Sequence, residues 1–144
     1  MLQNVPRNKA EIKRIYPVVL AFVGDAVYSL FVRAKLSEIK DGKPAQLQRA
    51  AANVVSAKGQ SSFLADLLPL LTEEEEEIYR RGRNAKKGTK SKNASAVDYN
   101  RSTGLEAVFG YLYLTGENVR LNELLSALPE TLFVLEETPK YYKP

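Results

Sequence analysis

The sequence predicts an all-α protein, and two observations lead to that fold class. Apolar residues recur at steps of three and four along most of the chain, which is the period of an amphipathic helix. We find no alternating strand pattern, hairpin signal or internal repeat. The 144 residues suffice for one hydrophobic core. We therefore expect a single domain over residues 1–144, with its core at about 17–128 and a C-terminal tail at about 131–144.

The first predicted helix runs from Pro17 to about Leu36. Proline suits the first turn of a helix, where its missing backbone N–H is not needed. The turn from Lys40 to Pro44 ends this helix and begins the next element. Its apolar face contains Val19, Phe22, Val23, Ala26, Val27, Leu30, Phe31 and Ala34.

The second helical segment extends from Ala45 to about Leu68. Gly59 is a candidate interruption, so the pattern allows one long helix or two short ones. Thr72 and Glu75 then have the spacing of a capping box, and the neighbouring glutamates match the positive end of a helix dipole. We interpret the glutamate run at 73–77 as the solvated start of a helix that continues into the arginines at 80–83.

A loop rich in glycine, serine, threonine, asparagine and lysine follows at about 88–98. Ordering so long a loop costs entropy, and we expect it to be either functional or mobile. The next predicted helix spans Tyr99 to Leu114 and is closed by residues 115–118. A last amphipathic helix begins at Val119 and stops at Pro129, before the tail.

The composition restricts the chemistry that this chain can perform. It contains no histidine and no cysteine, which excludes imidazole acid–base catalysis, thiol nucleophiles and zinc–thiolate sites. Carboxylates, hydroxyls, lysine, arginine and a bound metal ion remain. The N-terminal 17 residues do not resemble a secretory signal, and the apolar run between Tyr16 and Asp25 is too short to cross a bilayer. We expect a soluble cytoplasmic protein that needs no membrane.

Two carboxylates occupy unusual positions on the predicted helices. Asp25 follows Gly24 in the middle of an apolar helix, where a charge is costly unless something binds it. Glu106 lies at the edge of the apolar face of the 99–114 helix, one turn before Gly110. Spacing alone favours water-facing edge positions for both, since charged residues commonly border an apolar face. The other interpretation is a pair of partly buried ligands for a hard divalent cation.

The net charge is +4, and the positive charges are concentrated in one segment. Seven lysines and arginines lie between Arg80 and Lys92 with no acidic residue among them. This basic stripe could be a water-exposed face without a partner. Its high density of positive charge favours binding of a polyanionic partner instead.

Several segments along the chain resemble the ribonuclease III family. Leu20 to Arg33 is similar to the family's signature helix, with its apolar-Gly-Asp-Ala-apolar step, and Leu105 to Leu114 is similar to its second carboxylate helix. Residues 54–58, together with the glutamate run and Arg81 to Lys86, resemble the Mini-III branch, which lacks an appended double-stranded-RNA-binding domain. Ser102 and Thr103 before Glu106 also fit this branch.

The resemblance implies a ribonuclease III-like helical endonuclease that hydrolyses phosphodiester bonds of double-stranded RNA and leaves 5′-phosphate and 3′-hydroxyl ends. Asp25 and Glu106 would be the catalytic metal ligands for Mg²⁺, for which Mn²⁺ can substitute; no small-molecule cofactor is expected. Longer relatives carry further acids where this chain has Ala21 and Thr103. We therefore expect one defined Mg²⁺ site, with any second ion held mainly by RNA phosphate and water.

The resemblance also assigns the remaining residues. A-form RNA is recognised by shape and by phosphate and 2′-hydroxyl contacts, and the chain offers cations for these contacts. Phe22 matches an aromatic residue that inserts into the partner subunit of a homodimer. Ser102 and Thr103 are expected either to hold metal-bound waters or to cap the helix of Glu106. The expected RNA-binding residues are Lys58, Arg81, Arg83, Asn84, Lys86 and Lys87.

The expected substrate is precursor ribosomal RNA, in the maturation of 23S rRNA. The first alternative is a catalytically silent ribonuclease III-like scaffold that binds RNA or a ribonucleoprotein. The second is a helical protein-interaction module whose basic stripe contacts an acidic partner. Retention of two costly acids argues against a silent domain.

Overall fold

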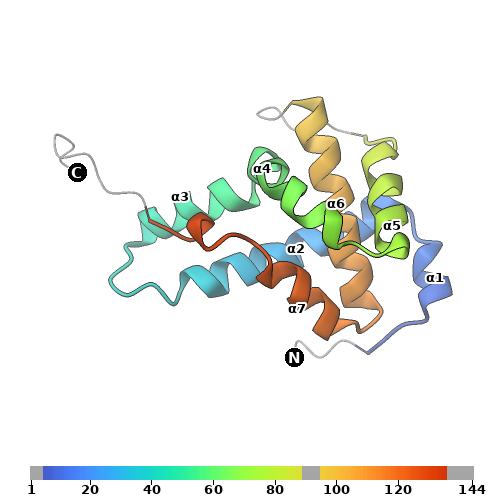
Figure 1. The fold of residues 1–144 in the computed structure, drawn as a ribbon, viewed down its shortest axis with the longest axis horizontal. Helices are drawn as coiled ribbons and strands as arrows, with labels where there is room; N and C mark the ends of the chain where they lie inside the picture. Colours follow the sequence, from blue (N-terminus) through green and yellow to red (C-terminus); the bar gives the residue numbers. More distant parts are fainter. Residues whose placement is uncertain (1–4, 89–94, 136–144) are drawn as a thin grey trace.

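The computed structural model describes residues 5–88 and 95–135, and every regular element in these ranges is helical, with no strand among them (Figure 1). The all-α prediction is confirmed. The elements are α1 (Lys9–Lys13), α2 (Pro17–Leu36), α3 (Pro44–Val55), α4 (Ala57–Leu67), the short 3₁₀ helix η1 (Leu68–Leu70), α5 (Glu73–Asn84), α6 (Ala96–Leu114), α7 (Asn118–Ser126) and the 3₁₀ helix η2 (Glu130–Leu132).

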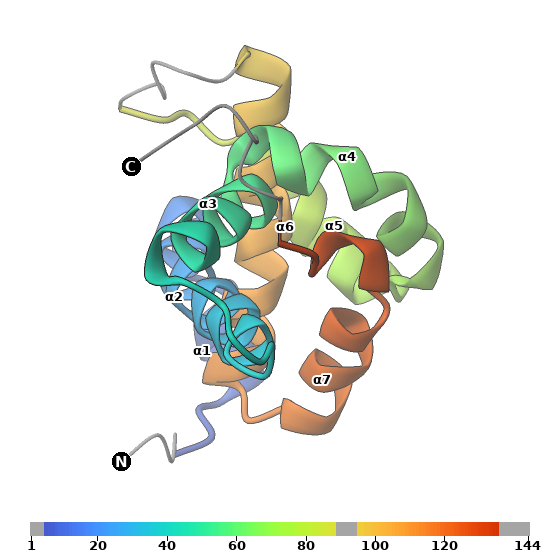
Figure 2. The ribbon, with the colours of Figure 1, turned by 90° about the vertical axis from the view of Figure 1, so that its left-hand side faces the viewer.

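Helix α6 is the centre of the fold. It contacts α2, α5, α4, α7 and α1, and its contact with α2 is the most extensive in the molecule. In Figure 2, α6 stands between α2 and α3 on one side and α5, α4 and α7 on the other. Ten consecutive or nearly consecutive residues of α6 are buried, from Ser102 to Leu112, because neighbouring helices cover it on all sides. A helix surrounded in this way needs little amphipathic character.

Two glycines allow α2 and α6 to pack with their backbones in contact. A Cβ atom built on Gly24 would lie 1.7 Å from the carbonyl oxygen of Glu106, and one built on Gly110 would lie 1.9 Å from the carbonyl oxygen of Leu20. Neither separation is compatible with a side chain, so each helix needs glycine where it meets the other. This crossing places the residue after Gly24 beside the middle of α6.

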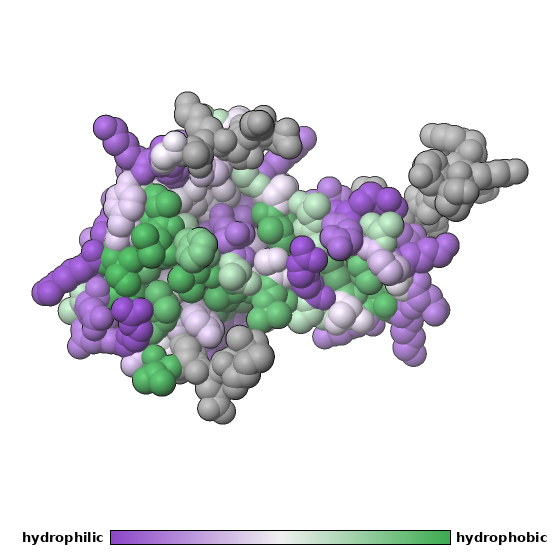
Figure 3. Space-filling view, turned by 180° about the vertical axis from the view of Figure 1, so that it is seen from behind, coloured by the Kyte–Doolittle hydropathy of each residue, from purple (hydrophilic) through white to green (hydrophobic). Residues whose placement is uncertain are grey.

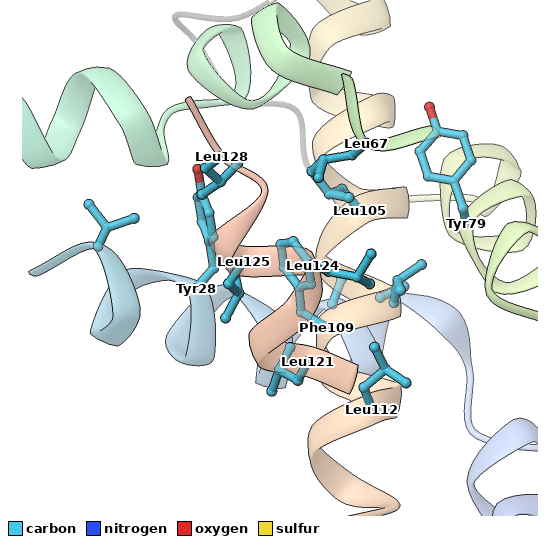
Figure 4. Packing of buried hydrophobic residues seen from close by; sticks show 14 of the residues in the cluster. Tyr28, Leu67, Tyr79, Leu105, Phe109, Leu112, Leu121, Leu124, Leu125 and Leu128 are labelled. Atoms are coloured by element: carbon cyan, nitrogen blue, oxygen red, sulfur yellow. The ribbon is translucent and has the colours of Figure 1, made fainter. Parts of the chain in front are cut away.

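Aromatic and leucine side chains fill the core around this crossing. The ring of Tyr28 on α2 stacks on Phe109 of α6 with centroids 5.5 Å apart, and Phe63 of α4 lies 6.2 Å from Tyr28. Leu121, Leu124 and Leu125 of α7 close the opposite side, and Figure 4 shows them turned toward Phe109. The Tyr28 hydroxyl donates a hydrogen bond to the carbonyl oxygen of Val54, so its only polar atom is satisfied.

Most predicted helix boundaries agree with the structure, and three differ. The chain breaks between α3 and α4 at Ser56, whose hydroxyl accepts from the backbone N–H of Gly59, and not at Gly59 itself. Helix α6 begins at Ala96, one turn earlier than predicted, because Ser95 caps it. The final long helix ends at Ser126. Residues 89–94 of the predicted loop and 136–144 of the predicted tail lie outside the described residues.

Sequence periodicity did not reveal α1, because five residues are too few to show a helical period. The capping box at the start of α5 is present, with Thr72 and Glu75 exchanging hydrogen bonds of 3.0 and 3.2 Å. Glu75 is buried rather than solvated as predicted, because Arg120 of α7 pairs with its carboxylate at 2.8 Å.

Helix α2 is long and apolar enough to cross a membrane by length and composition alone. A helix at the core of a water-soluble protein passes the same test. Here one face of α2 packs on α6, and Val19, Phe22 and Leu30 on the rest of the helix are exposed.

Candidate active site

A surface hollow of about 360 Å³ opens where α2, α4 and α6 meet. Both carboxylates singled out in the sequence line it, one from α2 and one from α6. The polar and apolar residues around it are Val18, Ala21, Phe22, Asp25, Val55, Ala57, Gln60, Tyr99, Ser102, Thr103 and Glu106. The structure therefore joins two acids that lie far apart in the sequence.

The glycine contact between α2 and α6 explains why the carboxylates meet. Gly24 lies against the backbone of Glu106, and Asp25 is the next residue along α2. Asp25 is exposed and Glu106 is only partly exposed, so the water-facing edge position that spacing favours describes Asp25 better than Glu106. Asp25 lies on the rim of the α2–α6 contact, whereas Glu106 lies within it.

The pKa of Glu106 is raised from its ordinary value to about 9. Burial is the main cause, and the hydrogen bond and negative charge of Asp25 raise the pKa further, while the Gln60 amide acts in the opposite direction. A carboxyl with this pKa is neutral at neutral pH. None of the ion pairs in residues 5–88 and 95–135 involves either acid.

This arrangement fits a hard divalent cation. Asp25 and Glu106 offer carboxylate oxygens from two helices to one hollow, and the hollow has room for water. Within the described residues no group of three or more Asp, Glu, His or Cys side chains could hold a metal ion together, so waters or a substrate must supply the other ligands. A cation and the Glu106 proton would compete for the same oxygens.

Ala21 and Thr103 line the same hollow as Asp25 and Glu106. Ala21 lies one helical turn before Asp25, and Thr103 one turn before Glu106, so a carboxylate at either position would add a ligand to this site. Both positions are buried and neither carries a charge. Their placement is consistent with a cation held by few protein ligands.

The hydroxyls of Ser102 and Thr103 do not cap the helix of Glu106, because Ser95 is the N-cap and lies two turns earlier. Both hydroxyls donate to the carbonyl oxygen of Tyr99, at 2.8 and 3.0 Å. Each oxygen keeps an acceptor lone pair on the side of the hollow, so the expected role in holding water stays a prediction.

The basic end of α5 packs beside this site. A Cβ on Gly82 would lie 2.9 Å from Cα of Gly104 and 3.1 Å from the carbonyl oxygen of Thr103, a residue of the hollow. The arginines that flank Gly82 therefore lie on a helix that packs against the helix of Glu106. On the other side, Lys58 is exposed in the first turn of α4, next to Ala57 in the wall of the hollow.

The six expected RNA-binding residues differ in their availability. Lys58, Asn84 and Lys86 are exposed. The Arg81 guanidinium donates to the carbonyl oxygen of Lys13 at 2.9 Å, and it thereby ties α5 to the end of α1. The Lys87 ammonium donates to three carbonyl oxygens at the end of α5, those of Gly82, Arg83 and Ala85.

Arg83 takes an intermediate position between these groups. Its guanidinium lies over the Tyr79 ring, 5.7 Å from the centroid, and donates to the side chain of Asn84. This contact orients the guanidinium without neutralising its charge. Lys90 and Lys92 of the basic stripe lie outside the described residues.

Gln60 is the residue of this site that sequence reasoning missed. It is 2% exposed and shares the inner face of α4 with Phe63, Leu64 and Leu67. The spacing of Gln60, Phe63, Leu64 and Leu67 places all four on one helix face, and three of them are apolar. A glutamine on such a face was a signal that sequence reasoning could have used, because a buried amide needs polar partners.

Known proteins resemble this chain in sequence and in structure. Residues 18–117 match the family model for the ribonuclease III domain. A protein named Mini-ribonuclease 3 from Brevibacillus brevis is 50% identical over 109 residues, covering 76% of this chain and 81% of the relative. The Mini-ribonuclease 3 of Streptococcus pneumoniae is 48% identical over 118 residues, covering 81% and 92%.

Among solved structures, the X-ray crystal structure of protein FN1578 from Fusobacterium nucleatum superimposes with a TM-score of 0.71 at 26% identity. The superposition covers 81% of this chain and 93% of that protein. The helical arrangement around α6 is thus shared with a protein of similar size.

Proposed function

This chain belongs to the ribonuclease III family, in the group named Mini-ribonuclease 3, and we propose that it cleaves double-stranded RNA with Mg²⁺ held by Asp25 and Glu106. An endoribonuclease activity on RNA follows from the family. The observation that supports the finer proposal is the meeting of the two carboxylates in one hollow, beside the basic end of α5.

When bound, Mg²⁺ would polarise a phosphate oxygen, lower the pKa of a bound water and neutralise charge on the leaving 3′ oxygen. Asp25 and Glu106 would hold the cation, and Glu106 must release its proton to do so. The hydroxyls of Ser102 and Thr103 can accept hydrogen bonds from waters in the hollow. Since Ala21 and Thr103 supply no carboxylate, we propose one protein-defined cation, with any second ion held mainly by RNA phosphate and water.

The basic residues are carried by two helices that pack on α6. Lys58 follows Ala57 of the hollow on α4, and Arg83, Asn84 and Lys86 lie at the end of α5, which packs on Gly104 and Thr103. We propose that these cations contact the phosphate rows of an A-form duplex. Arg81 and Lys87 contact backbone carbonyls within the chain, so we propose that they support this surface and add long-range positive charge.

Cleavage of duplex RNA in Mg²⁺, compared with Ca²⁺ and EDTA, tests the function directly. We expect cutting in Mg²⁺ only, and an Asp25→Asn loss of about 10³-fold, because a cation ligand worth several kcal/mol in the transition state is lost. Because Asp25 is exposed, the Asp25→Asn substitution should not disturb folding. The circular dichroism spectrum of the variant should match that of wild type. Wild-type protein that binds duplex RNA but never cuts it would support the silent-scaffold alternative.

The non-cutting Asp25→Asn protein also tests the mode of RNA binding. In competition gels we expect A-form RNA duplex to displace a bound RNA more effectively than B-form DNA of equal length and charge. Equal competition by both duplexes would contradict shape recognition and favour binding by charge alone.

The ends of the cleavage products are checked with a 5′-phosphate-dependent exonuclease, which should degrade the products and not the substrate.

We also propose that the protein is a homodimer and that α2 supplies the interface. Phe22 is 80% exposed, so it is not a core residue of its own chain. Val19 and Leu30 on α2 are exposed as well, and hydrophobic side chains gather on the face of the molecule to which α2 belongs (Figure 3). An exposed apolar patch centred on an aromatic residue is typical of a protein interface. Because Phe22 also lines the hollow, the partner would lie next to the carboxylates.

The substitution Phe22→Ala should weaken dimerisation by about 2–4 kcal/mol, the range for a central aromatic contact. At a micromolar concentration at which wild type is dimeric, we expect sedimentation to show that Phe22→Ala is a monomer. The substitution should leave the melting temperature of the monomer unchanged. Val119→Ala, at another exposed apolar residue on α7, is the matched control and should leave the mass unchanged. Dimers of Phe22→Ala that survive dilution as well as wild type would contradict this interface.

We propose precursor ribosomal RNA as the substrate, at the maturation of 23S rRNA in the cytoplasm. The named relatives are bacterial Mini-ribonucleases 3, and a domain of this size has few means of selecting RNA other than duplex shape. Accumulation of unprocessed 23S ends in cells that lack the protein is the expected result. Normal 23S ends in such cells would contradict this assignment without affecting the enzymatic one.

A further inference from the structure

The side chain of Gln60 is in a position that is costly for an amide. It is 2% exposed on the inner face of α4, and it lines the hollow together with Asp25 and Glu106. Its Nε2 donates a hydrogen bond of 2.9 Å to the carbonyl oxygen of Val55. Its Oε1 has no hydrogen-bond partner within the described residues. Buried polar atoms are nearly always paired, so this oxygen requires an explanation.

The orientation of the amide follows from its contact with Val55. A carbonyl oxygen is only an acceptor, so the amide atom that faces it must be the nitrogen. The second N–H of Gln60 serves the Glu106 carboxyl, because the amide interacts with that group as a hydrogen-bond partner. Rotating the amide by 180° would place Oε1 against the carbonyl oxygen of Val55, so that two acceptors would face each other. Oε1 is therefore the atom left without a partner.

Three side-chain hydroxyls of α2 and α6 already donate to backbone carbonyl oxygens. Tyr28 donates to the carbonyl oxygen of Val54, and Ser102 and Thr103 both donate to that of Tyr99. Among these groups no proton remains for Gln60 Oε1, so a water molecule in or beside the hollow is the donor that fits.

We propose that Gln60 is a positioning residue for the cation site, with its N–H orienting Glu106 and its Oε1 accepting a hydrogen bond from a water bound to the cation. This inference rests on the proposed function of Asp25 and Glu106. A site with only two carboxylates must keep several waters on its cation, and each such water needs an acceptor. Groups that hold the ligands and waters of a metal site contribute to its affinity almost as the ligands do. Gln60 is held by Val55 and lines the same hollow as the two carboxylates.

Calorimetric titration with Mg²⁺ alone, without RNA, tests the proposal in three proteins: wild type, Gln60→Met and Gln60→Glu. Methionine has nearly the shape of glutamine and removes both polar atoms, so we expect the Mg²⁺ affinity to fall by about 10–100-fold. Glutamate keeps an oxygen acceptor at the same position, so its affinity should stay close to wild type or exceed it. Gln48→Met, at an exposed glutamine of α3, is the control and should change nothing.

The melting temperature in EDTA separates this role from a structural one. Gln60→Met removes an unpaired buried oxygen but also the hydrogen bond to Val55, so its metal-free melting temperature should stay close to that of wild type. Wild-type Mg²⁺ affinity in Gln60→Met, or an equal loss of affinity in both variants, would overturn the proposal. If Gln60→Met does not fold, Gln60→Glu decides, since tight binding supports the acceptor role and weak binding contradicts it.

The same titrations separate this inference from the proposed function. If wild type binds Mg²⁺ through Asp25 and leaves duplex RNA intact, the proposed function fails while the comparison at Gln60 still holds. If wild type cuts RNA and Gln60→Met binds Mg²⁺ normally, only the role of Gln60 fails.

Discussion

The substitution Gly110→Ala is expected to destabilise the fold by more than about 3 kcal/mol, which is a large fraction of the stability of a domain of this size. The new methyl group would lie 1.9 Å from the carbonyl oxygen of Leu20 and would force α2 and α6 apart. The intrinsic helix preference of alanine, worth about 1 kcal/mol, opposes this loss but does not offset it. Urea denaturation measures the effect directly.

Gly88→Ala provides the control for Gly110→Ala. A Cβ on Gly88 would have no atom within 4 Å, so this change should leave the unfolding midpoint nearly unaltered. If Gly110→Ala melts like wild type, the helices do not pack backbone to backbone in solution. A folded Gly110→Ala protein that has lost Mg²⁺ binding would instead show that the α2–α6 distance sets the separation of the two carboxylates.

The substitution Glu106→Gln is expected to stabilise the metal-free protein at pH 8 and to reduce cleavage by about 10³-fold. The pKa of Glu106 is raised to about 9 in the folded protein, above its value in the unfolded chain. The stabilising contribution of the neutral carboxyl is thus fully present below the unfolded pKa and is lost as pH rises through about 9. Glutamine stays neutral throughout, so we expect a gain on the order of 2 kcal/mol at pH 8.

Melting curves at pH 5.5 and pH 8 in EDTA test this prediction. Wild type should lose more stability between these values than Glu106→Gln does, while Glu38→Gln, at an exposed glutamate, should follow wild type. A Glu106→Gln protein that melts below wild type at pH 8 would mean that the acid is not held neutral by burial and by Asp25. Such a trade of stability for activity is common at catalytic sites.

Local rules accounted for much of this fold before any coordinates were considered. Pro17 begins α2, and the reciprocal pair of Thr72 and Glu75 begins α5, because proline and the capping box act within a single turn. The same rules missed two helix starts at which the capping residue does not stand out in the sequence. Ser95 was hidden among other loop residues, and Ser56 was a less conspicuous break than Gly59.

The candidate site was predictable only in part. The family resemblance singled out Asp25 and Glu106, yet which acid is buried depends on how far each lies from the crossing of α2 and α6. The basic stripe was evident as a charge run. The charge run did not show which of its residues are exposed, such as Lys86, and which bind within the chain, such as Arg81. That difference depends on carbonyl oxygens of other segments, and a charge pattern contains no information about them.

By itself the sequence determined that the chain is helical, that it lacks the residues for imidazole and thiol chemistry, and that it resembles a nuclease family. These properties depend on periodicity, composition and short motifs, all of which are local. Only the tertiary structure decided that Asp25 and Glu106 share one hollow, that Gln60 lies beside them with an unpaired oxygen, and that Phe22 is exposed. The physical reason is the contact of Gly24 and Gly110, since backbone packing between distant helices sets which side chains meet and which ones water reaches.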